Sequence, residues 1–104
     1  IYSALLATLD PGDEVIISTP YWVSYSELVK MTGAIPVLVE TTRQARFLLK
    51  ADQLRQHVTP KTKMLMLNSP SNPTGSAYSK SELESIAKVV VVKDLICLSD
   101  EIYE

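Results

Sequence analysis

The hydrophobic positions of this chain fall into short continuous runs separated by stretches with a helical period. Four runs are apolar almost throughout, as expected for strands that are covered on both faces of a sheet. Pro36 in the second run favours an early or edge position, since proline cannot donate a ladder hydrogen bond. The runs are "EVIIS" (14–18), "IPVLVE" (35–40), "KMLMLNS" (63–69) and "LICLS" (95–99).

The segments between these runs predict four helices. Leu5 and Leu9 share one face of the first helix, which the turn "DPGD" ends. Gly33 stands where the second helix should stop, and Pro60 ends the third. The predicted helices cover residues 1–9, 23–32, 51–58 and 80–92.

The last of these helices has the clearest start signal. Ser79 and Glu82 have the spacing of a capping box, in which each side chain accepts a hydrogen bond from the other residue's backbone N–H. The β-branched run 89–92 weakens the end of the helix. Its apolar face is predicted to comprise Leu83, Ile86, Ala87 and Val90.

Alternating helices and continuous apolar strands predict an α/β fold with three αβα layers around a mostly parallel sheet. No internal boundary divides residues 1–104, so we expect a single domain or part of one. The chain opens on "IYSALLATLD", with no methionine or helix cap, and closes on "SDEIYE". We therefore expect a fragment of a longer protein.

Composition narrows the possible partners. The 104 residues are 46% hydrophobic and carry a net charge of −2, which gives no electrostatic case for binding nucleic acid or an anionic membrane. No apolar run approaches the roughly 20 residues of a membrane span. Cys97 is the only cysteine, so no internal disulfide can form, and a cytoplasmic protein is the default expectation.

Unusual polar and aromatic residues follow three of the predicted strands. Trp22 comes after the first, Asn72 after the third, and Asp100 and Tyr103 after the fourth. In an open parallel sheet these strand ends share one edge, which is where ligands bind. An aromatic plane, an amide, a carboxylate and a phenol that converge there suit a flat, polar, heteroaromatic ligand.

The segments "PYWVSY", "NSPSNPTG" and "SDEIYE" resemble motifs of the class I and II aminotransferases, in particular the aspartate aminotransferase family. The resemblance covers essentially the whole chain, in order, and implies part of the large domain of a fold type I enzyme that uses pyridoxal 5′-phosphate (PLP). It implies that Asn72 and Tyr103 bind the phenolic oxygen of PLP and that Asp100 pairs with the pyridine nitrogen. Trp22 would stack on the ring.

The same resemblance implies a reaction. The full-length protein is expected to transfer an amino group between an amino acid, aspartate first, and a 2-oxo acid, and to work as a homodimer. The lysine that forms the Schiff base with PLP is expected beyond Glu104, so no catalytic residue is assigned within the chain and the fragment alone is predicted to be inactive. The residues for the cofactor phosphate and the substrate carboxylate are expected outside it as well.

Other functions remain open at this stage. A prephenate or aromatic aminotransferase and a PLP-dependent lyase share the same motifs. A receiver-like signalling domain, of a different class, would use Asp100 to bind Mg²⁺ and accept phosphate, but it leaves Trp22, "NPTG" and Tyr103 without a role.

Each assigned residue also has a purely structural interpretation. The segment "SPSNPTG" can be a turn that ends a strand, Asp100 a helix cap, Tyr103 a core residue and Trp22 an anchor for a loop. Cys97 is interpreted as a small apolar filler of a buried strand. No metal ligands are assigned.

Overall fold

The computed structural model describes residues 2–19, 24–41, 49–68 and 79–100, which form four helices and four strands. Helices and strands alternate along these ranges, as the sequence predicts, and every boundary lies within two residues of the predicted one. The elements are α1 (Tyr2–Thr8), β1 (Glu14–Thr19), α2 (Ser24–Met31), β2 (Ile35–Glu40), α3 (Ala51–His57), β3 (Thr62–Asn68), α4 (Lys80–Val92) and β4 (Ile96–Asp100).

The four strands form one parallel sheet in the order β2-β1-β3-β4. Strand β1 pairs with β2 along its full length, from Glu14 opposite Ile35 to Thr19 opposite Glu40. The order places β2 at an edge, in agreement with its proline. Each connection between consecutive strands contains a helix, as parallel neighbours require.

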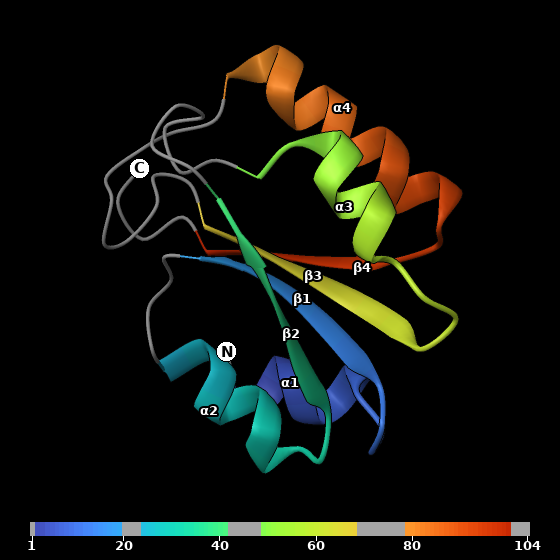
Figure 1. Cartoon of the computed structure of the whole chain (residues 1–104). Helices are drawn as coiled ribbons and strands as arrows, with labels where there is room; N and C mark the ends of the chain where they lie inside the picture. Colours follow the sequence, from blue (N-terminus) through green and yellow to red (C-terminus); the bar gives the residue numbers. More distant parts are fainter. Residues whose placement is uncertain (1, 20–23, 42–48, 69–78, 101–104) are drawn as a thin grey trace.

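Helices cover both faces of this sheet. Figure 1 shows α1 and α2 on one face and α3 and α4 on the other, so the predicted three-layer αβα fold is confirmed. Successive strand residues point to opposite faces, which explains why the strand sequences are continuously apolar. One core contains Leu5, Leu9, Val15, Ile17, Tyr25, Val29, Ala34, Met64 and Met66. The other contains Ile16, Val39, Leu49, Leu54, Leu65, Leu67, Ile86, Val89 and Leu95.

The predicted capping box starts helix α4. The Ser79 hydroxyl accepts a hydrogen bond from Glu82 N at 3.2 Å, and Glu82 Oε1 accepts one from Ser79 N at 2.8 Å. Two N–H groups that would otherwise lack a partner at the helix start are thereby satisfied. Lys93 and Asp94 close the helix at its other end, Asp94 with a left-handed φ of 54°.

The predicted apolar face of α4 is partly wrong. Ile86 is buried and Val90 is half-buried, but Leu83 and Ala87 are exposed, and Val89 is buried in their place. Four consecutive valines offer the helix more than one apolar face, and packing against the sheet and α3 selects between them.

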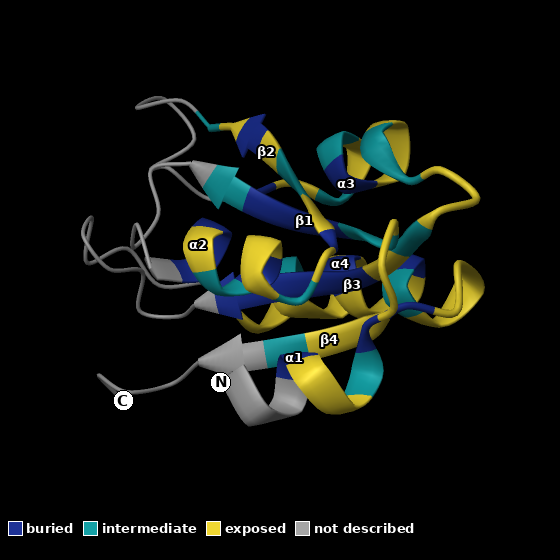
Figure 2. Cartoon of the chain, turned by 90° about the horizontal axis from the view of Figure 1, so that it is seen from below, coloured by how far each residue is buried: buried dark blue, intermediate teal, exposed yellow. Residues whose placement is uncertain are grey.

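The interpretation of β4 as a buried strand with Cys97 as a filler is also wrong. Among the residues that the structure describes, β4 pairs only with β3, and both Ile96 and Cys97 are exposed. Figure 2 shows exposed residues along β4, in contrast to the buried centres of β1 and β3. Among the described residues, no helix is both long and apolar enough to cross a membrane.

Candidate functional site

All four strands end on the same edge of the sheet because all are parallel. The last residues of β2, β1, β3 and β4 are Glu40, Thr19, Asn68 and Asp100. The register pairs Thr19 with Glu40 and Asn68 with Asp100, so neighbouring strands end level with each other. Ligands of open α/β sheets bind outside this carboxyl edge.

The chain reverses the direction of its crossovers between β1 and β3. The connection that leaves β1 runs through α2, on one face of the sheet, and the connection that leaves β3 runs through α4, on the other face (Figure 1). The two connections therefore diverge, and the carboxyl ends of these central strands form the topological switch point of the sheet. Such a point is the usual ligand position in doubly wound folds.

In the sequence, the predicted site residues end or follow strands β1, β3 and β4. Trp22, Asn72 and Tyr103 lie outside the described residues. Asp100 is the last residue of β4, where its backbone pairs with Asn68, and its side chain is not described. Neighbouring strands lie about 4.8 Å apart, so the ends of β1, β3 and β4 span roughly 10 Å, the scale of a small heteroaromatic molecule. The structure thus brings together the strand ends that carry these residues.

Helices α2, α3 and α4 follow strands β1, β2 and β3, so each begins on the side of this edge. Their unpaired N–H groups and macrodipoles give the edge a partial positive charge, which favours anionic groups nearby. The effect is strongest for α4, which has 13 residues, because α2 and α3 have eight and seven.

Gln53 fixes the carboxyl edge next to β2, a role that the sequence analysis missed. Its Nε2 donates to the Glu40 carbonyl at 3.1 Å, while its Oε1 accepts from Lys50 N at 3.2 Å. One amide thereby ties the start of α3 to the end of β2. The sequence signal for this role is the position of Gln53, three residues after Lys50, where a capping box has its Glu or Gln.

Cys97 lies three residues before Asp100 on β4, and its titration is clearly shifted. Burial raises the pKa of the thiol. The residue is exposed by surface area, but the sulfur is partly desolvated by its surroundings, which disfavours the thiolate. Because the thiolate is the nucleophile, Cys97 has the properties of a spectator rather than of a reactive cysteine.

The family model for "Aminotransferase class I and II" matches residues 1–104. The aspartate aminotransferase of Bacillus sp. (strain YM-2) is 48% identical over 104 residues, which are 100% of this chain and 26% of that protein. The aspartate/prephenate aminotransferase of Thermus thermophilus is 47% identical over 104 residues, which are 100% of this chain and 27% of that protein.

Solved structures agree with these sequence matches. The aspartate aminotransferase from Thermus thermophilus with maleate superposes with a TM-score of 0.96 at 48% identity, over 99% of this chain and 27% of that one. The aromatic aminotransferase from Pyrococcus horikoshii OT3 gives a TM-score of 0.93 at 47% identity, over 96% of this chain and 27% of that one. The chain therefore spans about a quarter of the length of the relatives that it matches.

Proposed function

This chain belongs to the class I and II aminotransferase family, and on that premise we propose that the protein catalyses transamination between an amino acid, L-aspartate first, and a 2-oxo acid. The observation that carries the proposal is the family match over the whole chain, and the adjacent carboxyl ends of β1, β3 and β4 beside the switch point support it. Relatives that are named aspartate aminotransferases support aspartate as the donor.

We propose PLP as the cofactor, at the carboxyl edge beside β1, β3 and β4. The topology supports this position, because Asp100 ends β4 and the strands that precede Trp22, Asn72 and Tyr103 in the sequence have adjacent carboxyl ends. When bound, PLP supplies an electron sink for the carbanion that forms at the substrate Cα. The other chemical tasks are binding, orientation and the control of protons, and these fall to the protein.

Asp100 has the clearest of these tasks. A carboxylate at hydrogen-bond distance from the pyridine nitrogen favours the proton there, because it stabilises the positive charge of the protonated ring. Asn72 and Tyr103 would donate hydrogen bonds to the phenolic oxygen, and Trp22 would cover a ring face and exclude water from it. The lysine that links the cofactor covalently is proposed to follow Glu104 in the full-length protein.

A second donor class has support of its own. Relatives of similar identity are named aspartate/prephenate aminotransferases, and one matching structure is an aromatic aminotransferase. The residues that select the substrate are not among those assigned in this chain. A homodimer in the cytoplasm is part of the same proposal and rests on the family resemblance. The receiver-like alternative is dropped, because the aminotransferase match extends over residues 1–104.

The proposal is tested on the full-length protein saturated with PLP. We expect L-aspartate alone to change the absorbance of the bound cofactor, and a 2-oxo acid added afterwards to restore it, with oxaloacetate as the first product. L-Phenylalanine and L-alanine are tested as amino donors for comparison with L-aspartate. Faster turnover with phenylalanine would move the assignment to an aromatic aminotransferase. A protein that binds no PLP would overturn the proposal.

A further inference from the structure

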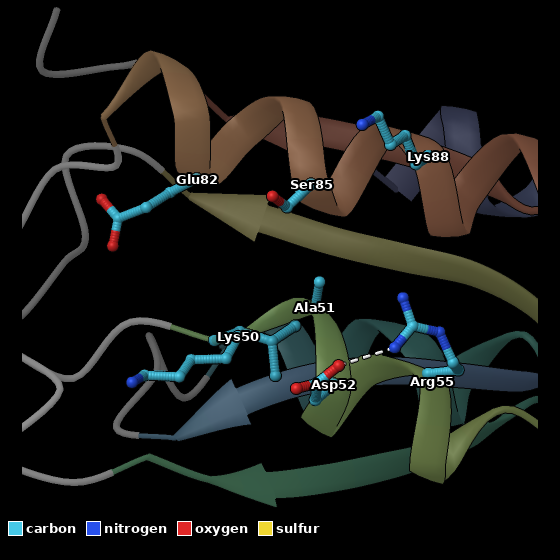
Figure 3. A pocket seen from close by; sticks show the side chains of 8 residues that line it. Lys50, Ala51, Asp52, Arg55, Glu82, Ser85 and Lys88 are labelled. Atoms are coloured by element: carbon cyan, nitrogen blue, oxygen red, sulfur yellow. Dashed lines mark hydrogen bonds and ion pairs between the residues drawn. The ribbon is translucent and has the colours of Figure 1, made fainter.

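A groove runs between helices α3 and α4 on the outer side of the helical layer that they form. Its volume is about 430 Å³. Figure 3 shows Arg55 reaching from α3 towards α4, with Ser85 and Lys88 on the α4 side. The groove is lined by Leu49, Lys50, Ala51, Asp52, Arg55, Glu82, Ser85 and Lys88.

A smaller cavity of about 90 Å³ adjoins this groove, and Arg55 and Lys88 line both. The remaining lining residues of the small cavity are Val89, Val92 and Lys93. Three cationic residues therefore line a space that has no acidic residue among its described lining residues. The cavity has room for several water-sized groups, and therefore for a small anion such as phosphate.

One hydrogen bond orients the guanidinium of Arg55 and leaves most of its N–H donors available. Asp52 Oδ1 accepts a hydrogen bond from Arg55 Nη1 at 2.6 Å, across one turn of α3. This contact engages one of the five N–H donors of the arginine. The others can bind an anion, and the planar fork of the group matches a phosphate in particular.

The helix dipole does not explain Lys88, which stands four residues after Glu84, the spacing of a favourable ion pair along a helix. Lys88 lies outside the last turn of α4, where a cation would offset the helix dipole, and it forms no ion pair with any residue in the described ranges. The two carboxylates of the groove are already engaged, Asp52 by Arg55 and Glu82 by the backbone of Ser79. An anion between Lys88 and Arg55 would offset their mutual repulsion.

We propose that the groove between α3 and α4 binds a small phosphorylated molecule, with the phosphate between Arg55, Lys88 and Lys93. With the charge of Asp52 included, these side chains carry a net charge of two, which matches a phosphate dianion better than a single carboxylate. Ala51 offers apolar contact to the body of the ligand in the larger groove. Ser85 donates its proton to the Ser81 carbonyl at 3.1 Å, so its oxygen is available to accept a hydrogen bond from the ligand.

The test is a calorimetric titration of the full-length, PLP-saturated protein with inorganic phosphate at constant ionic strength. Lys88→Gln and Arg55→Gln should each weaken phosphate binding by about tenfold, the usual scale for losing one charge-assisted hydrogen bond. Lys30→Gln is the matched control, since Lys30 is an exposed lysine of α2 on the opposite face of the sheet. It should leave the affinity unchanged within twofold, as expected for a distant surface charge.

Three results would overturn the proposal. Phosphate could fail to bind in the millimolar range, or all three variants could weaken it equally, which would show only diffuse attraction to a basic surface. Succinate could bind as tightly as phosphate with the same dependence on Lys88, in which case the phosphate assignment is wrong. Circular dichroism of each variant confirms that a lost affinity does not reflect a lost fold.

Discussion

The two edges of the sheet are expected to have different roles. At the amino edge, polar groups are paired with near neighbours. The Thr59 hydroxyl donates to Glu14 Oε1 at 2.7 Å, Thr62 Oγ1 accepts from Thr59 N at 2.8 Å, and Asp13 Oδ2 accepts from Asp10 N at 2.9 Å. The last two bonds close turns and the first ties the turn before β3 to the start of β1, so all three serve the fold.

On the carboxyl side, the residues assigned to the candidate site end the strands or follow them in the sequence. The segments that carry Trp22, Asn72, Asp100 and Tyr103 follow the ends of β1, β3 and β4. We take the difference to mean that the amino edge determines stability and the carboxyl edge determines chemistry, a division familiar from barrel folds. Substitutions at the two edges should therefore separate activity from stability.

The largest effect is expected for Asp100→Ala in the full-length protein. Without the carboxylate, the protonated pyridine nitrogen is no longer favoured. The transition state should lose several kcal/mol of stabilisation, and kcat/KM falls tenfold for each loss of about 1.4 kcal/mol. The melting temperature should change little. Cys97→Ala, three residues earlier on the same strand, is the control and should keep near-normal turnover. Normal turnover in Asp100→Ala would disprove the role of Asp100.

At the amino edge, Gly33→Ala and Gly12→Ala form a matched pair. Both glycines have a left-handed φ, of 85° and 89°, so alanine costs about 1 kcal/mol of backbone strain at either position. A Cβ at Gly33 would also lie 3.2 Å from the Cβ of Pro11, whereas a Cβ at Gly12 would have no neighbour within 4 Å.

Gly33→Ala should therefore lower the free energy of unfolding by roughly 1–3 kcal/mol, and more than Gly12→Ala, by adding overpacking to strain. Urea denaturation of both variants measures the difference, and PLP-dependent activity should be unchanged in each at a temperature where the protein is folded. If both variants lose the same unfolding free energy, Pro11 moves away from the added methyl group at position 33 without a measurable cost.

Ser79→Ala tests whether a residue on the carboxyl side can act on stability alone. It removes the acceptor for Glu82 N and should cost about 1 kcal/mol of unfolding free energy. Ser85→Ala, an exposed position within the same helix, should stay within about 0.5 kcal/mol of the unmodified protein. A large activity loss in Ser79→Ala, without a stability loss, would contradict the capping role.

The smallest effect concerns Cys97. Its pKa is raised on folding, so the folded state holds the thiol proton to higher pH than the unfolded state does. The corresponding contribution to stability is present below the unfolded pKa and is lost as the pH rises through the folded pKa. At pH 8 we expect Cys97 to react with iodoacetamide more slowly in the folded chain than in urea. Faster reaction in the folded chain would contradict the raised pKa.

The sequence predicts the fold well where the signals are local. Strand 35–40 is predicted to the residue, and the Ser79–Glu82 spacing predicts the start of α4. These signals depend on apolar runs and caps, which do not need a partner distant in sequence.

The predictions fail where burial depends on a packing partner that is distant in the sequence. Burial of Cys97 depends on whether a strand lies on the free side of β4, and the packed face of α4 depends on its contact with α3 and the sheet. The groove that joins Arg55 to Lys88 has no sequence signature at all, since its two walls come from separate helices. Of the candidate site, the sequence predicts the residue types and their order, and the parallel sheet explains why their strand ends meet.

The central claim is that the carboxyl edge at the β1/β3 switch point holds the PLP ring. A crystal structure of the full-length protein with PLP bound tests it most directly. We expect the Asp100 carboxylate within about 3 Å of the pyridine nitrogen, and Asn72 and Tyr103 at a similar distance from the phenolic oxygen. A cofactor ring bound at the amino edge, or at the carboxyl edge without contact to Asp100, would contradict the account.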